Sequence, residues 1–154
     1  MLGHGIFHAA GIIRGNSGYL FVGPSGSGKS TVAHLSATRG HTILHDDQVV
    51  VWPARPGEYV VKDLFSMNPD SPLKAIFFLL QDTIDRLDPL STQLVAKRSL
   101  ESFLDSSSRS VLFGPILRSA FASCVTLARS VPGYELHFRK SPGFWDVIDA
   151  ESGI

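Results

Sequence analysis

The chain has 154 residues, of which 44% are hydrophobic and 18% are charged, a balance that suits one domain with a buried core and excludes a disordered protein. Fourteen basic and fourteen acidic residues give a formal net charge of zero, which argues against a nucleic-acid partner. The only cysteine, Cys124, excludes an intrachain disulfide and a cysteine metal cluster. Residues 1–10 lack the pattern of a secretory signal, and the longest apolar run, 75–80, is too short to span a bilayer. We therefore expect a cytoplasmic protein without a membrane partner.

The first third of the chain alternates strands with one helix. In chain order the sequence predicts a strand at 5–13, a strand at 19–22, a loop at 23–28, a helix at 29–38, and strands at 42–44 and 49–52. The turn-forming cluster 14–18 predicts that the first two strands form a hairpin. Val32, Leu35 and Ser36 share one side of the helix, and Gly40 indicates its end.

The rest of the chain continues the same mixture. It predicts a strand at 59–61, a loop at 66–72, a buried strand at 75–80, helices at 90–104 and 111–130, and a strand at 134–138. Phe113, Leu117, Phe121 and Leu127 have near-helical spacing, which indicates a core-facing side of the second helix, while the same face also suits a homo-oligomer contact. There is no internal repeat or linker, so the fold class is α/β in a single domain over the whole chain.

Residues 23–30 form the clearest motif. They read Gly-Pro-Ser-Gly-Ser-Gly-Lys-Ser and fit the phosphate-binding pattern G-x-x-x-x-G-K-[ST] completely. The glycines let successive backbone N–H groups turn toward one anion, and the helix that follows presents its positive end to phosphate. Lys29 can contact the β- and γ-phosphates, and the Ser30 hydroxyl can bind magnesium. The expected nucleotide ligands are Gly23, Ser25, Gly26, Ser27, Gly28, Lys29, Ser30 and Thr31.

An acidic pair follows the next strand. Asp46 and Asp47 come directly after residues 42–45, where a carboxylate can reach magnesium beside a phosphate loop. Adjacent residues of a regular strand point to opposite faces, so both carboxylates reach one site only if the strand ends or twists there. One can hold magnesium and the other can accept a proton from a hydroxyl. Alternatively, the pair simply opens a turn.

Four segments together resemble a known family: 7–11, 18–30, 39–41 and 44–47 are similar to the catalytic domain of HPr kinase/phosphorylase, and more closely to the small HPr-kinase-related proteins. The resemblance covers 4–52 well and extends weakly through 72–79 and 134–138. It implies a phosphoenolpyruvate-carboxykinase-like P-loop fold and transfer of phosphate to a protein serine. By this resemblance Asp46 matches the catalytic base, Asp47 the neighbouring acidic residue near magnesium, and His8 a histidine close to the phosphates. From the residues alone, His8 on an apolar strand is a core or edge histidine.

The sequence thus predicts a kinase that uses ATP and Mg2+ and transfers the γ-phosphate to a hydroxyl, such as a serine of a protein or peptide. The expected catalytic residues are Asp46, Lys29 and His8, and the expected magnesium ligands are Ser30 and Asp47. Two alternatives stay open: a small-metabolite kinase, and a nucleotide-binding regulatory module with little catalysis. The short segment between Asp47 and the strand at 75–80 motivates the second alternative. The acceptor, the nucleotide base and the oligomeric state are left open.

Overall fold

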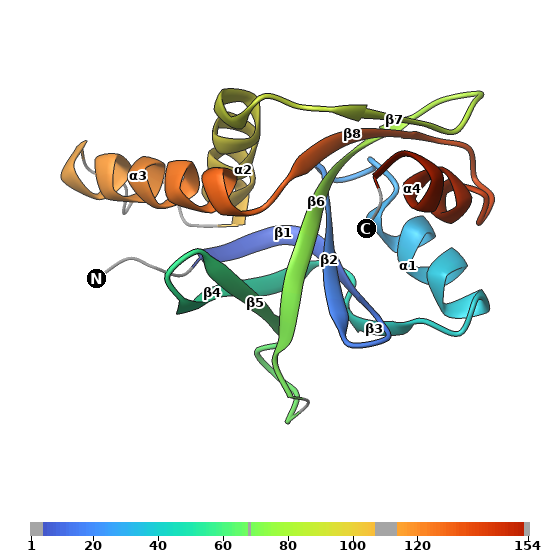
Figure 1. Ribbon diagram of the computed structural model, residues 1–154, viewed down its shortest axis with the longest axis horizontal. Helices are drawn as coiled ribbons and strands as arrows, with labels where there is room; N and C mark the ends of the chain where they lie inside the picture. Colours follow the sequence, from blue (N-terminus) through green and yellow to red (C-terminus); the bar gives the residue numbers. More distant parts are fainter. Residues whose placement is uncertain (1–4, 68, 107–113, 153–154) are drawn as a thin grey trace.

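The computed structural model describes residues 5–67, 69–106 and 114–152 (Figure 1). Its elements, in chain order, are β1 Gly5–Arg14, β2 Ser17–Val22, α1 Lys29–Thr38, β3 Thr42–His45, β4 Gln48–Arg55, β5 Glu58–Lys62, β6 Ser71–Gln81, β7 Arg86–Pro89, α2 Thr92–Ser106, α3 Gly114–Ser130, β8 Gly133–Phe138 and α4 Phe144–Ser152. The fold is therefore mixed α/β, as the alternation of strand and helix patterns predicts. Within this part of the chain, no helix is both long and apolar enough to cross a membrane.

The strands form one sheet in the order β2-β1-β4-β5-β6-β8-β7, with β3 paired to β1. An additional pairing between β2 and β6 closes a circuit of five strands, β2-β1-β4-β5-β6. Gly18 lies inside this circuit, where a Cβ atom would come within 2.2 Å of Val61 Cγ2, so the close approach of β2 and β5 needs a glycine. β6 pairs in parallel with both β2 and β8, and the other pairings are antiparallel.

Two hydrophobic clusters lie on opposite sides of the central strands. Alternate residues of a strand point to opposite faces, so Phe77 of β6 belongs to one cluster while Ile76 and Phe78 belong to the other. The first cluster packs beneath α1 and α4 and contains the fully buried Trp145, whose indole Nε1 donates a hydrogen bond to Ser36 Oγ at 2.9 Å. The second cluster packs beneath α2 and α3. In Figure 1 these two helix pairs lie on either side of the long strand β6.

The predicted core-facing side of the 111–130 helix is partly wrong. Leu127 is buried, but the side chains of Leu117 and Phe121 are 39% and 47% exposed. Phe113 lies outside the described residues. The buried face of α3 instead carries Ala120, Cys124, Leu127 and Ala128, because small side chains let α3 pack closely against its neighbours. Leu117 and Phe121 lie on a different side of α3 from these buried residues. Their spacing is helical, but the side of the helix that they share is exposed.

Several predicted boundaries differ from the structure. β4 continues through Pro53, which is tolerated because β1 pairs with β4 only as far as Val51 and needs no N–H from the proline. β6 begins at Ser71, inside the predicted 66–72 loop, and α2 begins at Thr92 rather than at residue 90. The sequence did not predict β7 or α4. β7 is short and polar and takes its strand form from pairing with β8.

Candidate functional site

The glycine-rich loop 23–28 joins β2 to α1, as the motif predicts. Gly26 and Gly28 have φ angles of 83° and 107°, in the left-handed region that favours glycine. Gly28 is the N-cap of α1, no side chain caps this end, and the first turn of the helix contains no acidic residue. The positive end of α1 is therefore uncompensated by its own sequence, which is the arrangement that stabilises an anion.

Lys29 lies across the start of this loop. The residue is only 6% exposed, and its Nζ donates hydrogen bonds to Gly23 O at 2.6 Å and to Pro24 O at 2.9 Å. Ser27 contributes a second polar group, because its buried Oγ has no hydrogen-bond partner among the described residues. A loop with an ammonium group held against its first two carbonyls and an unused hydroxyl fits a phosphate chain.

The remaining predicted nucleotide ligands are more accessible. Ser25 and Ser30 are exposed, and Thr31 at the first turn of α1 is half-buried. The Ser30 hydroxyl therefore lies at the surface of the same helix end as Lys29. Oxygen ligands of this kind, together with carboxylates, are the ones that magnesium prefers.

Asp46 and Asp47 interrupt the strand that faces β1. β3 pairs with β1 through His45 and Gly11, whereas β4 pairs with β1 through Gln48 and His8. The two aspartates bend away from the ladder between these pairs, and the ladder resumes where the Ala9 N–H donates to Asp47 O at 2.9 Å. Both side chains are exposed. The strand thus ends at the acidic pair, which is the condition under which both carboxylates can face one site.

His45 stabilises this bend, a role that the sequence did not reveal. Its Nδ1 accepts hydrogen bonds from the N–H groups of Asp47 and Gln48 at 3.1 and 2.9 Å. A side chain that accepts hydrogen bonds from the backbone N–H groups two and three residues ahead replaces the backbone hydrogen bonds that the strand loses at the bend. The available sequence signal was the position of His45 directly before two turn-forming aspartates.

His8 and Asp47 lie together. His8 Nε2 is 2.7 Å from Asp47 Oδ1, and the side chains are 17% and 57% exposed. Ser102 of α2 holds the backbone of His8, whose N–H donates to Ser102 Oγ at 3.1 Å. Asp46 makes no hydrogen bond or ion pair with another described residue. The structure therefore separates the two aspartates by environment: Asp47 is paired with a histidine, and Asp46 is open to solvent.

The loop and the aspartates lie at one edge of the sheet. β2 and β3 flank β1 on opposite sides, and both are antiparallel to it, so they run in the same direction. Their last residues, Val22 and His45, pair with Ala9 and Gly11. The two strand ends therefore lie on either side of the middle of β1, close to His8. The carboxyl ends of strands that run in one direction are where ligands bind in open α/β sheets.

A pocket of about 610 Å³ opens at this edge, between the loop and the helices α2 and α3. Its volume lies within the range of about 300–1,000 Å³ that small-molecule sites occupy. The pocket begins at the ends of β2 and β6 and shares Gly23 and Pro24 with the phosphate loop. Its lining residues are Val22, Gly23, Pro24, Phe78, Leu79, Arg98, Glu101, Ser102, Leu104 and Leu117.

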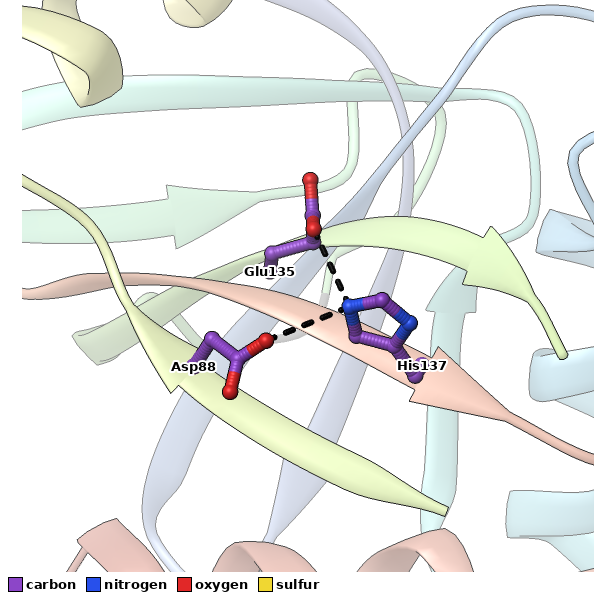
Figure 2. Close-up of side chains that lie close together, drawn as sticks. All are labelled: Asp88, Glu135 and His137. Carbon is purple, nitrogen blue, oxygen red and sulfur yellow. Dashed lines mark hydrogen bonds and ion pairs between the residues drawn. The ribbon is translucent and has the colours of Figure 1, made fainter. Parts of the chain in front are cut away.

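A second polar group lies on the paired strands β7 and β8. Figure 2 shows Asp88, Glu135 and His137, whose potential ligand atoms lie within 4.8 Å of one another. His137 Nε2 is 3.3 Å from Asp88 Oδ2 and 3.0 Å from Glu135 Oε1. Period-two spacing in the predicted strand places Glu135 and His137 on one face, but nothing in the sequence predicted Asp88 beside them.

Arg86 supplies a positive charge to this group. Its Nη2 lies 3.1 Å from His137 Nε2, and its Nε donates to Asp88 at 3.1 Å. On the other side of the ring, His137 Nδ1 is 2.9 Å from Asp82 Oδ2. The hydrogen bond from the Thr83 N–H, and then that from His137, lowers the pKa of Asp82. We interpret the group as an ion-pair network that fastens β7 to β8.

These features define a mixed α/β domain with a glycine-rich loop before an uncapped helix and an acidic pair after a neighbouring strand. Residues 2–151 match the family described as SynChlorMet cassette protein ScmC, and the chain belongs to this family. Among curated proteins, none matches the chain.

The family match overturns the resemblance to HPr kinase/phosphorylase. That resemblance rested on short segments within 4–52, whereas the ScmC match covers almost the whole chain. A glycine-rich loop followed by an acidic pair is short enough to recur in proteins of different families, so the motif predicts a kind of site and does not identify a family. The roles of Asp46, Asp47 and His8 therefore depend on their geometry in this chain.

Proposed function

We propose that the chain binds ATP with magnesium and transfers the γ-phosphate to a hydroxyl group. The observation that carries the proposal is that loop 23–28 with Lys29 and the acidic pair follow strands that end on either side of the middle of β1. A fold of the P-loop nucleotide-binding type belongs to the same proposal. The loop between a strand and an uncapped helix supports it.

Each residue of the site has a task that its environment suits. The loop amides and Lys29 bind the phosphates and stabilise the charge that develops during transfer. Ser30 and Asp47 hold magnesium, which supplies charge neutralisation to the phosphate oxygens. His8, in contact with the Asp47 carboxylate, fixes the direction of that side chain. His8 is therefore a positioning residue in this scheme.

Asp46 is the better proton acceptor of the two aspartates, because it has no partner among the described residues and is exposed. In the transfer step the acceptor oxygen forms a bond to the γ-phosphorus, and the bond from that phosphorus to the β–γ bridging oxygen breaks. The hydroxyl proton passes to Asp46, and ADP leaves. Magnesium and Lys29 offset the charge that accumulates on the leaving oxygen.

The exposure of both aspartates also favours a second candidate, a nucleotide-binding regulatory module with little turnover. Phosphoryl transfer benefits from the exclusion of water, and the Asp47 side chain is 57% exposed. Such a module needs the phosphate loop and magnesium but no proton acceptor. The two candidates therefore differ in whether Asp46 has any function.

The test measures magnesium-dependent ATP binding by calorimetry and transfer of labelled γ-phosphate to proteins of a source-cell extract and to serine peptides. Lys29→Met keeps the buried alkyl volume and removes the charge, so ATP affinity should fall about 10–100-fold. Asp46→Asn should leave ATP affinity unchanged and reduce transfer about 10²–10⁴-fold. Lys74→Ala, at an exposed lysine of β6, is the matched control and should change neither.

The outcomes separate the candidates. A labelled band that is lost in Lys29→Met and in Asp46→Asn but kept in Lys74→Ala supports the kinase. Tight ATP binding without transfer, and without an effect of Asp46→Asn, supports the regulatory module. If wild type does not bind ATP with magnesium, both candidates are wrong.

A further inference from the structure

The pocket beside the phosphate loop lies at the end of the site where the γ-phosphate is transferred. Lys29, which contacts β- and γ-phosphates in loops of this type, donates hydrogen bonds to the backbone oxygens of Gly23 and Pro24. Both of these residues line the pocket. The pocket therefore adjoins the reacting end of the phosphate chain, where an acceptor must approach.

The polar side chains that line the pocket are already engaged or repel anions. Arg98 pairs with Glu135 at 2.8 Å and lies over the ring of Phe78 at 5.7 Å. Ser102 is hydrogen-bonded to the backbone of His8. The third polar lining residue, Glu101, is exposed and negatively charged. Among the described lining residues the only cationic side chain, Arg98, is already paired with a carboxylate, so away from the loop the pocket favours an apolar group.

The remaining walls are mainly hydrocarbon, supplied by Val22, Phe78, Leu79, Leu104 and Leu117. Of these, Leu117 on α3 is 39% exposed even though the prediction placed it in the core. Burying a leucine-sized apolar surface contributes about 1.5–3 kcal/mol, so an apolar group that covers these walls gains affinity. The volume of about 610 Å³ accommodates a large side chain together with its adjoining backbone.

A second apolar surface lies on the opposite side of the aspartates. In the segment after β5, the side chains of Leu64, Phe65 and Met67 are 49%, 80% and 102% exposed. The ring of Phe65 lies 6.2 Å from that of His45, the residue that stabilises the bend at Asp47. Clustered exposed apolar side chains of this kind mark binding surfaces.

A continuous series of contacts joins the two surfaces. Ser102 in the pocket contacts His8, His8 contacts Asp47, the backbone of Asp47 contacts His45, and His45 packs near Phe65. A small metabolite that fills the pocket would leave the Phe65 side uncovered. An extended chain that crosses the aspartates would contact both surfaces.

We propose that the acceptor is a peptide segment in which apolar side chains flank the phosphorylated serine, and that the pocket binds one of these side chains. This inference rests on the proposed kinase activity. The serine oxygen then meets the γ-phosphate at Asp46, with one flank of the peptide against Leu117 and the other against Phe65. The pocket selects the acceptor by hydrophobic contact, and the aspartates carry out the chemistry.

The test uses short alanine-based peptides with a single serine and with phenylalanine, leucine, glutamate or lysine at neighbouring positions. Wild type should phosphorylate the phenylalanine- and leucine-flanked peptides with a KM at least about tenfold below that of the all-alanine peptide. Leu117→Glu should remove this preference, so that the KM for the phenylalanine- and leucine-flanked peptides rises about tenfold to that of the all-alanine peptide. Phe121→Glu is the matched control, because Phe121 is exposed on the same helix but does not line the pocket.

The results distinguish the inference from the function on which it rests. Transfer to all peptides with equal KM, or an equal effect of Leu117→Glu and Phe121→Glu, overturns the pocket assignment and leaves the kinase intact. Efficient transfer to a free apolar alcohol and not to peptides also overturns it, in favour of a small-molecule acceptor. If ATP binds but no acceptor is phosphorylated, the proposed function fails and the inference fails with it.

Discussion

Replacing Gly28 with alanine should destabilise the protein through two separable effects. The φ angle of Gly28 is 107°, and a left-handed conformation costs an L-residue about 1–2 kcal/mol. A Cβ atom there would also lie 2.5 Å from Phe138 Cζ, on a ring that is 1% exposed and cannot move aside freely. Overpacking of this kind costs about 1–3 kcal/mol. We therefore expect a loss of about 2–5 kcal/mol in the free energy of unfolding, or about 4–20 °C in Tm.

Two other glycines provide the matched controls. Gly26 and Gly40 have φ angles of 83° and 82°, and a Cβ at either position would meet nothing within 4 Å. Gly26→Ala and Gly40→Ala should therefore each lower the free energy of unfolding by about 1–2 kcal/mol, the cost of the left-handed backbone conformation alone. Gly40 lies outside the phosphate loop, so Gly40→Ala should also bind ATP normally if the proposed function is correct.

Urea unfolding followed by fluorescence measures the free energies, and calorimetry measures ATP binding. The comparison of Gly28→Ala with Gly40→Ala isolates the contact with Phe138. If Gly28→Ala is no less stable than Gly40→Ala, the close packing of α1 against the end of β8 is incorrect. That result would also remove the structural reason for a glycine at this position.

Two further predictions concern titratable groups. Burial raises the pKa of the Cys124 thiol to about 12, so this thiol should resist iodoacetamide at pH 8 in the native protein and react only after unfolding. Mass spectrometry measures the labelling, and rapid labelling of the native protein would contradict the burial of Cys124. The hydrogen bond from Arg39, at 2.9 Å, lowers the pKa of Asp146 below its ordinary value of 3.8. The stability that this pair contributes is fully present above the ordinary pKa of 3.8. It is lost as the pH falls through the lower pKa that Asp146 has in the folded protein. Asp146→Asn should therefore be less stable than wild type near neutral pH and should approach it in acid; a stability difference that is independent of pH would exclude this linkage.

The features that could be predicted from the sequence are the local ones. The hairpin of β1 and β2 follows from two apolar runs around a turn cluster, and the 29–38 helix has the predicted bounds. The phosphate loop also has its expected place between a strand and a helix. In each case the determining interactions lie within a few residues of one another, so the pattern contains the information.

The features that could not be predicted depend on distant partners. The sequence places Asp47 near the loop only by analogy, and the contact between His8 and Asp47 arises because β1 pairs with the bend between β3 and β4. The exposed face of α3 depends on which small residues pack against α2. Helical spacing alone could not distinguish Leu117 from Leu127, because both occupy apolar positions at suitable intervals.

The position of β1 between β2 and β3 has a consequence for how the site responds to a ligand. Neighbouring strands are about 4.8 Å apart, so the phosphate loop and the acidic pair begin on strands about 10 Å from each other. The pairings of β1 with β2 and with β3 set this distance, and the second has an irregularity between Gly11 and Ile12. If the chain binds ATP with magnesium as proposed, the Asp47 side chain and the loop have to reach across this span, because magnesium lies only about 2 Å from each of its oxygen ligands. Under the proposed function, we expect this span to stay constant through a reaction cycle, and any closure over the reactants to come from α2, α3 or the segment that carries Phe65.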